Sequence, residues 1–466
     1  MKNNNTRRTF LKTSGIVSLG FIGLQNFACS AGTKGQEVAE GAIQVGYGKL
    51  KRDPEGILKL PEGFSYKIIS RSGTPMSDGF VVPGKPDGMA TFEGEGGRVI
   101  IVRNHEVSRD DAENGPFGKD YELLPNLEKS MIYEYGSGVT PGLGGTTTVI
   151  YNEETGEVEE EYLSLAGTIR NCAGGKTPWG SWVTCEETVE KAGGDVEKDH
   201  GYNFEVPALM KPGMAQPIPL KEMGRFNHEA ISVDPNSGIV YQTEDRHDGL
   251  IYRYIPNVPG ELAQGGKLQV LALKGKKSFD TRNWKRLKLD NPMPIGEKLP
   301  VEWLDIDEID SPKDDLRIRG FENGAARFAR GEGMWYGNDG VYFACTNGGK
   351  IEKGQIFRYT PSPKEGTTSE NDQPGTLELF VEPNNTNIVN NCDNLTVAPW
   401  GDVVTCEDDE HPRIVGVKPD GSFYKLAENV GYSSEFAGGC FSPSGKTFFV
   451  NIQHAGLTVA ITGPWV

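Results

Sequence analysis

The chain has 466 residues, 36% of them hydrophobic, with 61 glycines and 29 prolines. Its formal net charge of -17 lacks the basic excess typical of nucleic-acid binding, so we expect no such partner. The excess of carboxylates suits hard cations, although simple solubility would explain it equally well.

The N-terminus predicts an export signal. Arg7 and Arg8 stand in the segment TRRTFLK (residues 6–12), and an apolar run follows over residues 15–27. A charged start before so short an apolar run is typical of a signal peptide rather than a membrane span. The paired arginines match the twin-arginine signal. We therefore expect residues 1–30 to be recognised by the twin-arginine export machinery, and the mature protein to be periplasmic.

Cys29 closes the apolar run and raises the question of a lipid anchor. Lipidation there would attach the protein to the outer membrane or cell surface. The residues before Cys29 (Asn26 to Ala28) make a poor lipidation signal, because a leucine-like residue is usual in place of Asn26. Both outcomes stay open. Residues 31–55 are expected to be a linker.

A strand–turn–strand unit recurs six times in the rest of the chain. The second strands of the units are expected at residues 98–106, 180–187, 238–245, 340–347, 401–408 and 446–454. Six such units predict an all-β protein, a six-bladed β-propeller over residues 56–466 with loop insertions between blades. We treat residues 261–315 as the longest loop. An early strand at residues 64–69 is expected to complete the last blade.

Further strands are expected after most of these units, at residues 131–135, 201–206, 250–254 and 355–359. Three cysteines, Cys185, Cys345 and Cys406, fall at matching positions in the second strands. A small apolar residue repeated in this way indicates core packing.

In five of the six units, one position of the first strand is acidic or a thiol. Counting back six residues from the turn gives Cys172, Glu229, Glu332 and Asp393, and Asp87 is the counterpart in the first unit. The first strands of a propeller line its axis. The paired second strand returns to the same end of the axis, so its last residues lie near the first residues of its partner. Those last residues include Glu106, Glu186, Glu187, Glu244, Asp245, Glu407 and Asp408.

So many carboxylates cannot crowd at one rim unless cations neutralise them or they hold protons. Oxygen ligands in number favour Ca²⁺, and the thiolate of Cys172 adds a place for iron or another transition metal. The alternative is an acidic rim that is merely solvated. The expected metal ligands are Cys172, Glu187, Glu229, Glu332, Glu106, Glu186, Glu244, Asp393 and Glu407.

Several short motifs resemble the PhoX family of alkaline phosphatases. They are NHE (residues 104–106), RNCAGG (170–175), PWG (178–180), CEE (185–187), RFNHE (225–229) and ARGEG (329–333). The resemblance implies a six-bladed propeller with an iron pair and several calcium ions, which hydrolyses small phosphate monoesters. It further implies that Cys172 binds iron as Fe³⁺, and that Glu187, Glu229 and Glu332 bind iron or Ca²⁺.

The resemblance also implies that Arg330 contacts the substrate phosphate. A guanidinium can grip two phosphoryl oxygens at once, but an ion pair with Glu332 is the plainer interpretation. His105 and His228 each stand in Asn-His-Glu, so they could be general acids or could orient the neighbouring glutamates.

We also expect Asn104 and Asn227, which precede the two histidines, to contact the substrate. Two other functions stay open: a calcium-dependent propeller lactonase or phosphotriesterase, and a non-catalytic binding propeller stabilised by calcium. The protein is expected to be a monomer.

Overall fold

The computed structural model describes residues 46–466. The expected signal peptide, Cys29 and residues 31–45 of the expected linker therefore lie outside the described residues. Strands dominate the described part, in which the one α-helix is α1 (Leu316–Asn323). In residues 46–466 no helix is both long enough and apolar enough to cross a membrane. The protein is all-β, as the sequence predicts.

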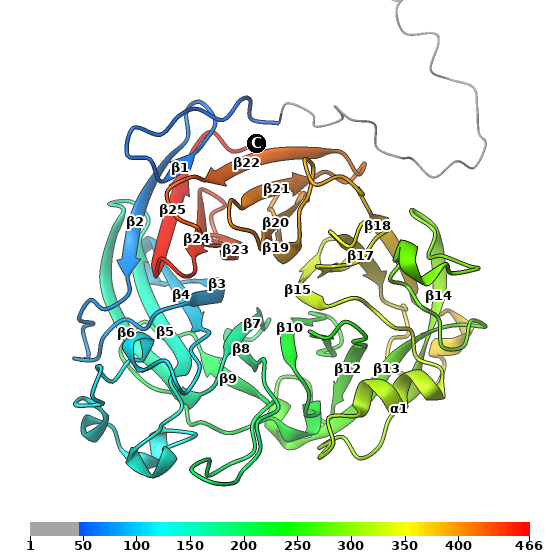
Figure 1. Cartoon of the computed structure of the whole chain (residues 1–466), viewed down its shortest axis with the longest axis horizontal. Helices are drawn as coiled ribbons and strands as arrows, with labels where there is room; N and C mark the ends of the chain where they lie inside the picture. Colours follow the sequence, from blue (N-terminus) through cyan, green and yellow to red (C-terminus); the bar gives the residue numbers. More distant parts are fainter. Residues whose placement is uncertain (1–45) are drawn as a thin grey trace, which may run out of the picture. The chain divides into compact units, whose positions relative to one another are not determined.

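The strands form five antiparallel sheets around a common axis, a propeller-like arrangement (Figure 1). The first sheet contains β3 (Pro86–Glu93), β4 (Arg98–His105), β5 (Gly144–Asn152) and β6 (Glu157–Thr168). The second contains β7 (Asn171–Lys176), β8 (Ser181–Glu186) and β9 (Asn203–Pro207). The fourth contains β19 (Cys392–Val397), β20 (Val403–Glu407), β21 (Arg413–Val417), β22 (Phe423–Asn429) and β1 (Leu58–Lys59).

The third sheet has nine strands. One half contains β10 (His228–Val233), β11 (Val240–Glu244), β12 (Ile251–Pro256), β13 (Gly266–Leu273) and β14 (Lys298–Asp305). The other contains β18 (Thr376–Val381), β17 (Gln355–Thr360), β16 (Gly340–Cys345) and β15 (Gly331–Gly337). The two halves join because β14 pairs with both β13 and β18.

The last sheet closes the ring. It contains β23 (Phe436–Phe441), β24 (Thr447–Ile452), β25 (Leu457–Thr462) and β2 (Ser65–Arg71). Strand β2 pairs with β25, so a segment from the start of the described chain completes the last sheet, as predicted. The innermost strands β3, β7, β10, β15, β19 and β23 contact one another in that order, and β23 contacts β3.

Two expectations about local structure are wrong. The segment 261–315 is not a plain loop, because it contains β13 and β14, which hydrogen-bond to neighbouring strands. The segment 131–135 is not a strand. Tyr133 follows a 3₁₀ turn (Lys129–Met131), and its N–H bonds the Ala166 carbonyl at 3.0 Å, so this segment only touches the edge of β6.

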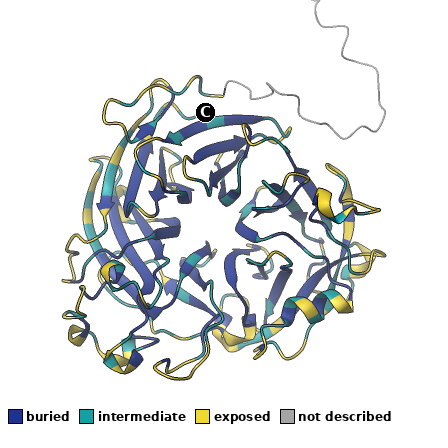
Figure 2. Ribbon diagram, in the orientation of Figure 1, coloured by how far each residue is buried: buried dark blue, intermediate teal, exposed yellow. Residues whose placement is uncertain are grey.

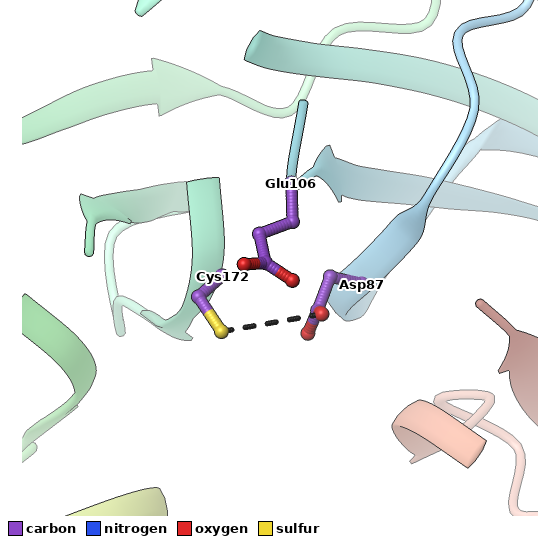
Figure 3. A group of neighbouring side chains, drawn as sticks. All are labelled: Asp87, Glu106 and Cys172. Atoms are coloured by element: carbon purple, nitrogen blue, oxygen red, sulfur yellow. Dashed lines mark hydrogen bonds between the residues drawn. The ribbon is translucent and has the colours of Figure 1, made fainter. Parts of the chain in front are cut away.

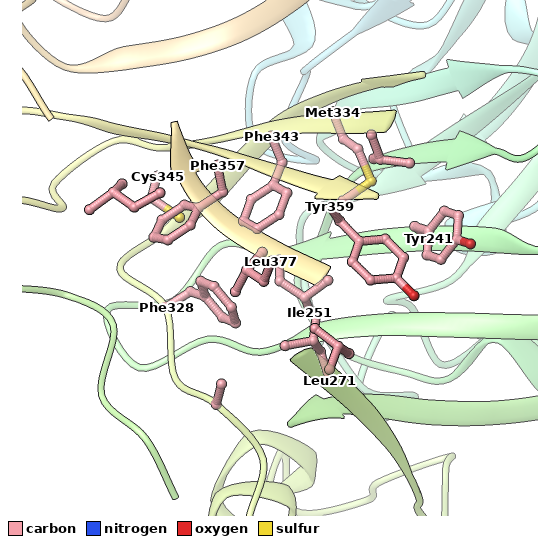
Figure 4. Close-up of a cluster of buried hydrophobic side chains, with 14 of the residues drawn as sticks. Tyr241, Ile251, Leu271, Phe328, Met334, Phe343, Cys345, Phe357, Tyr359 and Leu377 are labelled. Carbon is pink, nitrogen blue, oxygen red and sulfur yellow. The ribbon is translucent and has the colours of Figure 1, made fainter. Parts of the chain in front are cut away.

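Side chains from neighbouring sheets interlock to form the core. In one cluster Phe343 and Phe357 stack with ring centroids 5.2 Å apart, and Phe328 meets both edge-on (Figure 4). The inward strands are buried, and exposure concentrates in the loops and on α1 (Figure 2). Cys185, Cys345 and Cys406 are fully buried and free, which confirms the core packing expected of them.

Candidate metal centre

The second residue of every innermost strand lies at the same end of the axis, which we call the mouth. These residues are Asp87, Cys172, Glu229, Glu332, Asp393 and Ala437. Five of the six offer a metal ligand, and they are the residues that the repeat count selected.

A β-bulge places the ligand in each of these five strands. In β7, Asn171 pairs with Glu186, but the next pair is Gly174 with Thr184, so one extra residue stands on the β7 side. The same shift follows the first residue of β3, β10, β15 and β19. Because a bulge re-aims the side chains within it, the ligand can turn toward the axis. In β23 the bulge comes one residue later, and its second residue is Ala437.

A second set of acids follows the second strands. Glu106, Glu187, Asp245 and Asp408 each donate a backbone N–H to a carbonyl two residues before the inner-strand ligand. Glu187, for example, bonds the Arg170 carbonyl at 2.9 Å. This shared bond brings the two sets to the same level of the mouth. We call these four side chains the mouth carboxylates.

The inner-strand ligands and the mouth carboxylates other than Asp245, together with Glu435, form four overlapping groups of possible ligands, and the ligand atoms within each group lie within 4.8 Å of one another. The groups are Asp87, Glu106 and Cys172; Cys172, Glu187 and Glu229; Glu229, Glu332 and Asp393; and Asp393, Asp408 and Glu435. Cys172, Glu229 and Asp393 each belong to two groups, so the groups follow one another around the mouth. Figure 3 shows the first group, with its carboxylates and thiol turned toward one another.

The chemistry of these side chains fits bound cations. Glu229 is fully buried, and neither of its carboxylate oxygens has a hydrogen-bond partner; Oδ1 of Asp87 lacks one as well. Unpaired buried oxygens are costly unless something compensates them. A cation that accepts these oxygens as ligands removes that cost, so the donor set fits a metal centre.

Burial and mutual repulsion raise the pKa values of several buried groups in the mouth. Burial, followed by repulsion from Asp245 and Glu106, raises the pKa of Glu187 to about 8. Burial and Asp408 raise the pKa of Asp393 to about 7. Burial, with Glu187 next, raises that of Glu229 well above its ordinary value. Burial and Asp87 do the same for the Cys172 thiol. Each shift disfavours the charged form, which a bound cation would favour.

Two arginines stand among these acids. Arg330 donates Nε and Nη2 to the Asp245 carboxylate at 2.9 and 3.1 Å, and Nη2 also bonds Glu332 at 2.7 Å. Arg170 bonds Glu106 at 2.6 Å and also bonds Glu187. Both have left-handed backbone conformations, with φ of 53° and 51°. Both precede an inner-strand ligand by two residues, so they occupy equivalent positions.

Three of the expected metal ligands do not reach the mouth. Glu186, Glu244 and Glu407 end the second strands, and they point back into their sheets because successive side chains of a strand alternate in direction. We call them the anchor carboxylates. Glu186 accepts from His200 Nδ1 at 2.7 Å and from the Gly201 N–H at 2.9 Å.

The other two anchor carboxylates have similar partners. Glu407 accepts from Arg413 Nε at 2.7 Å and from the Arg413 N–H at 2.9 Å. Glu244 accepts from the Tyr252 hydroxyl at 2.8 Å. These contacts hold the start of the third strand, or the segment before it, against the end of the second. The expectation that the three residues lie with the mouth ligands is therefore not met.

The two histidines also turn away from the mouth. His105 is fully buried, with Nδ1 2.9 Å from the Gly84 carbonyl and Nε2 2.8 Å from the Thr147 hydroxyl. His228 stacks on Phe226, with its Nε2 3.0 Å from the Gly224 carbonyl. Burial lowers the pKa of His228 to about 3, so the ring is neutral. This placement does not suit a general acid facing the substrate.

The two asparagines are occupied as well. Asn104 donates to the Cys172 and Ala173 carbonyls at 3.0 and 2.6 Å and accepts from the Trp182 indole at 2.8 Å. These bonds fix the backbone of the Cys172 bulge. Asn227 accepts from Arg246 at 2.7 Å. The structure thus gives both asparagines protein partners.

Sequence reasoning did not select several residues of the mouth. Asp245 and Asp408 stand directly after Glu244 and Glu407, and spacing along the strand does not tell which of the two neighbours faces the mouth. Arg170 precedes Cys172 by two residues, as Arg330 precedes Glu332, so the repeat itself pointed to it. Glu435 stands two residues before Ala437, at the same position as the arginines.

Comparison with known proteins identifies the family. The family model for "Alkaline phosphatase PhoX" matches residues 45–157 and 142–456. The chain belongs to the PhoX alkaline phosphatase family. The protein is thus a phosphatase, a hydrolase whose family acts on small phosphate esters and depends on metal, and its acidic groups could hold that metal.

Solved structures support the same fold. PhoX of Pseudomonas fluorescens, in complex with vanadate as a transition-state analogue, matches with a TM-score of 0.60 at 17% identity over 88% of this chain and 96% of that one. A gluconolactonase of Xanthomonas campestris matches with a TM-score of 0.37 at 11% identity over 87% and 97% of the two chains, too distant to support an argument. Among curated proteins no sequence matches the chain.

Proposed function

We propose that the protein hydrolyses phosphate monoesters at the mouth, with cations held by the inner-strand ligands and the mouth carboxylates. The observation that carries this proposal is the unpaired, fully buried carboxylate of Glu229 at the junction of two ligand groups. No residue among 46–466 donates a hydrogen bond to it, and a cation would compensate its charge. Membership of a phosphatase family supports the same reaction.

We infer two kinds of metal. The groups made of carboxylates alone, around Glu332 and around Glu435, suit Ca²⁺, which prefers several oxygen ligands. The two groups that share Cys172 suit iron, because a thiolate is a poor ligand for calcium. Bound cations would supply charge neutralisation for the phosphoryl group and would activate water as a nucleophile.

Arg330 would orient the phosphate. Two of its nitrogens are held by Asp245 and Glu332, and Nη1 makes no hydrogen bond to any described residue. The side chain remains 28% exposed, so Nη1 can reach a substrate oxygen. The negative charge of Glu332, against the opposing effect of burial, raises the pKa of Arg330, and the guanidinium stays charged. Arg170, in the equivalent position, would contact a second oxygen.

We further infer that the propeller has six blades in one domain over residues 56–466. Counting the two halves of the nine-stranded sheet separately gives six sets of strands, each with one innermost strand. The ring of contacts among those strands supports this count.

Localisation is also a proposal. The twin-arginine motif at Arg7 and Arg8 supports export of the folded protein to the periplasm, with residues 1–30 as signal and residues 31–55 as linker. Replacing both arginines by lysine should leave the protein in the cytoplasmic fraction, and unchanged export would refute the proposal. Lipid labelling of wild type and Cys29→Ala would decide between anchored and free forms. We propose a monomer, which sedimentation would test.

The decisive experiment combines metal analysis of the purified protein with turnover of p-nitrophenyl phosphate. We expect calcium and iron together with monoesterase activity. In Cys172→Ala, iron and activity should be lost while the circular dichroism spectrum is kept. Cys440→Ala is the matched control, because that cysteine is buried away from the mouth and should keep both. A wild-type protein without iron and without turnover would refute the proposal.

A further inference from the structure

A second pocket lies at the opposite end of the strands that carry the mouth ligands. Strands β7, β10 and β15 begin with Cys172, Glu229 and Glu332, and their last residues line a cavity of about 220 Å³. We call it the far-end pocket. Its lining is Lys176, Thr177, Pro178, Ile231, Ser232, Val233, Pro235, Met334, Trp335 and Tyr336.

A layer of glycines and Trp335 separates this pocket from the mouth. Gly88 and Gly333 bring neighbouring backbones so close that a Cβ on either would lie 2.6 Å or less from a backbone atom. Trp335 packs against three hydrophobic clusters from different sheets. The space left in this layer is about 20 Å³, room for about one water molecule. An occupant of the far-end pocket therefore could not reach the mouth.

The far-end pocket has one cation with unused bonding capacity. The Lys176 ammonium donates to the Thr91 carbonyl at 2.8 Å and lies 4.9 Å from the centre of the Phe92 ring. It forms no ion pair with a described carboxylate, although the chain is strongly acidic, and two of its three protons remain available.

Most of the remaining lining is apolar or aromatic, with Trp335 and Tyr336 beside Met334 and Ile231. Pockets for drug-sized ligands measure about 300–1,000 Å³, so this one suits a molecule with about one ring. One unpaired cation matches one negative charge. A phosphate ester, which carries two charges, would lack a second cation here.

We propose that the far-end pocket binds a small aromatic carboxylate, with the ring against Trp335 and the carboxylate accepting from Lys176. This site is separate from the phosphatase centre and does not depend on its metals. Aromatic stacking and a charge-assisted hydrogen bond together favour such a ligand over a neutral one.

The test is titration of the full-length protein with 3-phenylpropionate and with its neutral analogue 3-phenylpropionamide, followed by tryptophan fluorescence and calorimetry. We expect saturable binding of the carboxylate with a Kd of about 0.1–1 mM, and weaker binding of the amide. Trp335→Phe should remove the fluorescence change but keep the heat of binding. Orthovanadate, which targets a phosphatase centre, should not displace the carboxylate.

Variants locate the site. Lys176→Gln should weaken the carboxylate about 10-fold and leave the amide unchanged. Lys221→Gln is the matched control, because Lys221 also lies over an aromatic ring, that of Tyr202, but outside the pocket. Both variants should keep p-nitrophenyl phosphate turnover.

Three results would overturn the proposal: no saturable signal up to about 10 mM of the carboxylate, equal losses in Lys176→Gln and Lys221→Gln, or displacement by orthovanadate. Because these readouts do not involve turnover, failure of the far-end pocket would be distinguishable from failure of the phosphatase mechanism.

Discussion

Neighbouring acids in this chain have opposite surroundings. Glu187 faces the mouth, where burial and other carboxylates raise its pKa to about 8. Glu186, one residue earlier, faces into its sheet and accepts bonds from His200 and from backbone N–H groups. The same difference in direction separates Asp245 from Glu244 and Asp408 from Glu407. Buried carboxylates thus serve two purposes here: those that face into their sheets hold strands together, and those that face the mouth can hold cations.

A pair of matching substitutions tests most directly whether Glu187 and Glu186 have different roles. Glu187→Gln removes a charged ligand from the mouth and should lower kcat/KM for p-nitrophenyl phosphate by about 100-fold or more, because charge stabilisation at a preorganised site is the largest catalytic contribution. Glu186→Gln should change kcat/KM far less at temperatures where the variant is folded. Equal losses of activity in the two variants would contradict the division.

The two substitutions should have the opposite order of effect on the free energy of unfolding, with Glu186→Gln the more destabilising. Glu186→Gln places an amide N–H₂ against donors that need an acceptor, and removing one partner of a buried charged pair costs about 3–5 kcal/mol. Urea unfolding should show this loss. For metal-stripped Glu187→Gln we expect stability equal to or above that of the stripped wild type, since a repelled charge is removed. Destabilisation of stripped Glu187→Gln would show that Glu187 is itself an anchor.

The anchor layer should also make stability depend on pH. Burial lowers the pKa of His200, but Glu186 and Glu134 outweigh burial and raise it to about 9. The folded state therefore holds a proton that the unfolded state loses near pH 6.5, so this contribution is fully present below about pH 6.5 and is lost as the pH rises through about 9. The loss amounts to about 3 kcal/mol.

Urea unfolding of wild type and His200→Gln at about pH 6 and about pH 9 would measure it. The stability difference between the two proteins should shrink at the higher pH. A difference that stays constant would show that His200 does not carry the charge.

The smallest expected effect distinguishes the arginines of the two layers. Arg330→Lys cannot reproduce the two-pronged contact with Asp245 and should weaken vanadate inhibition about 10-fold. Arg317→Lys, the matched change, alters an arginine 3.8 Å from the anchor carboxylate Glu244 and should affect stability rather than inhibition. Unchanged inhibition in Arg330→Lys would remove Arg330 from substrate binding.

The sequence by itself determined the repeat, and the repeat determined the level of the ligands. A recurring strand–turn–strand unit with fixed spacing places Cys172, Glu229, Glu332 and Asp393 at equivalent positions, whatever surrounds them. Burial of the three matching cysteines follows from the same count. The short family motifs added the reaction, which spacing alone could not give.

Only the tertiary structure decided which acids face the mouth. Counting residues to the end of a strand is uncertain by one, and one residue reverses the direction of a side chain, so Glu186, Glu244 and Glu407 could not be separated from their neighbours by spacing. The bulges that aim Cys172 and Glu229 arise from pairing with the next strand, and His105 is occupied by the Gly84 carbonyl and by Thr147 of β5. Local sequence predicts where a ligand can stand, but contacts across the fold decide whether its charge is left unpaired.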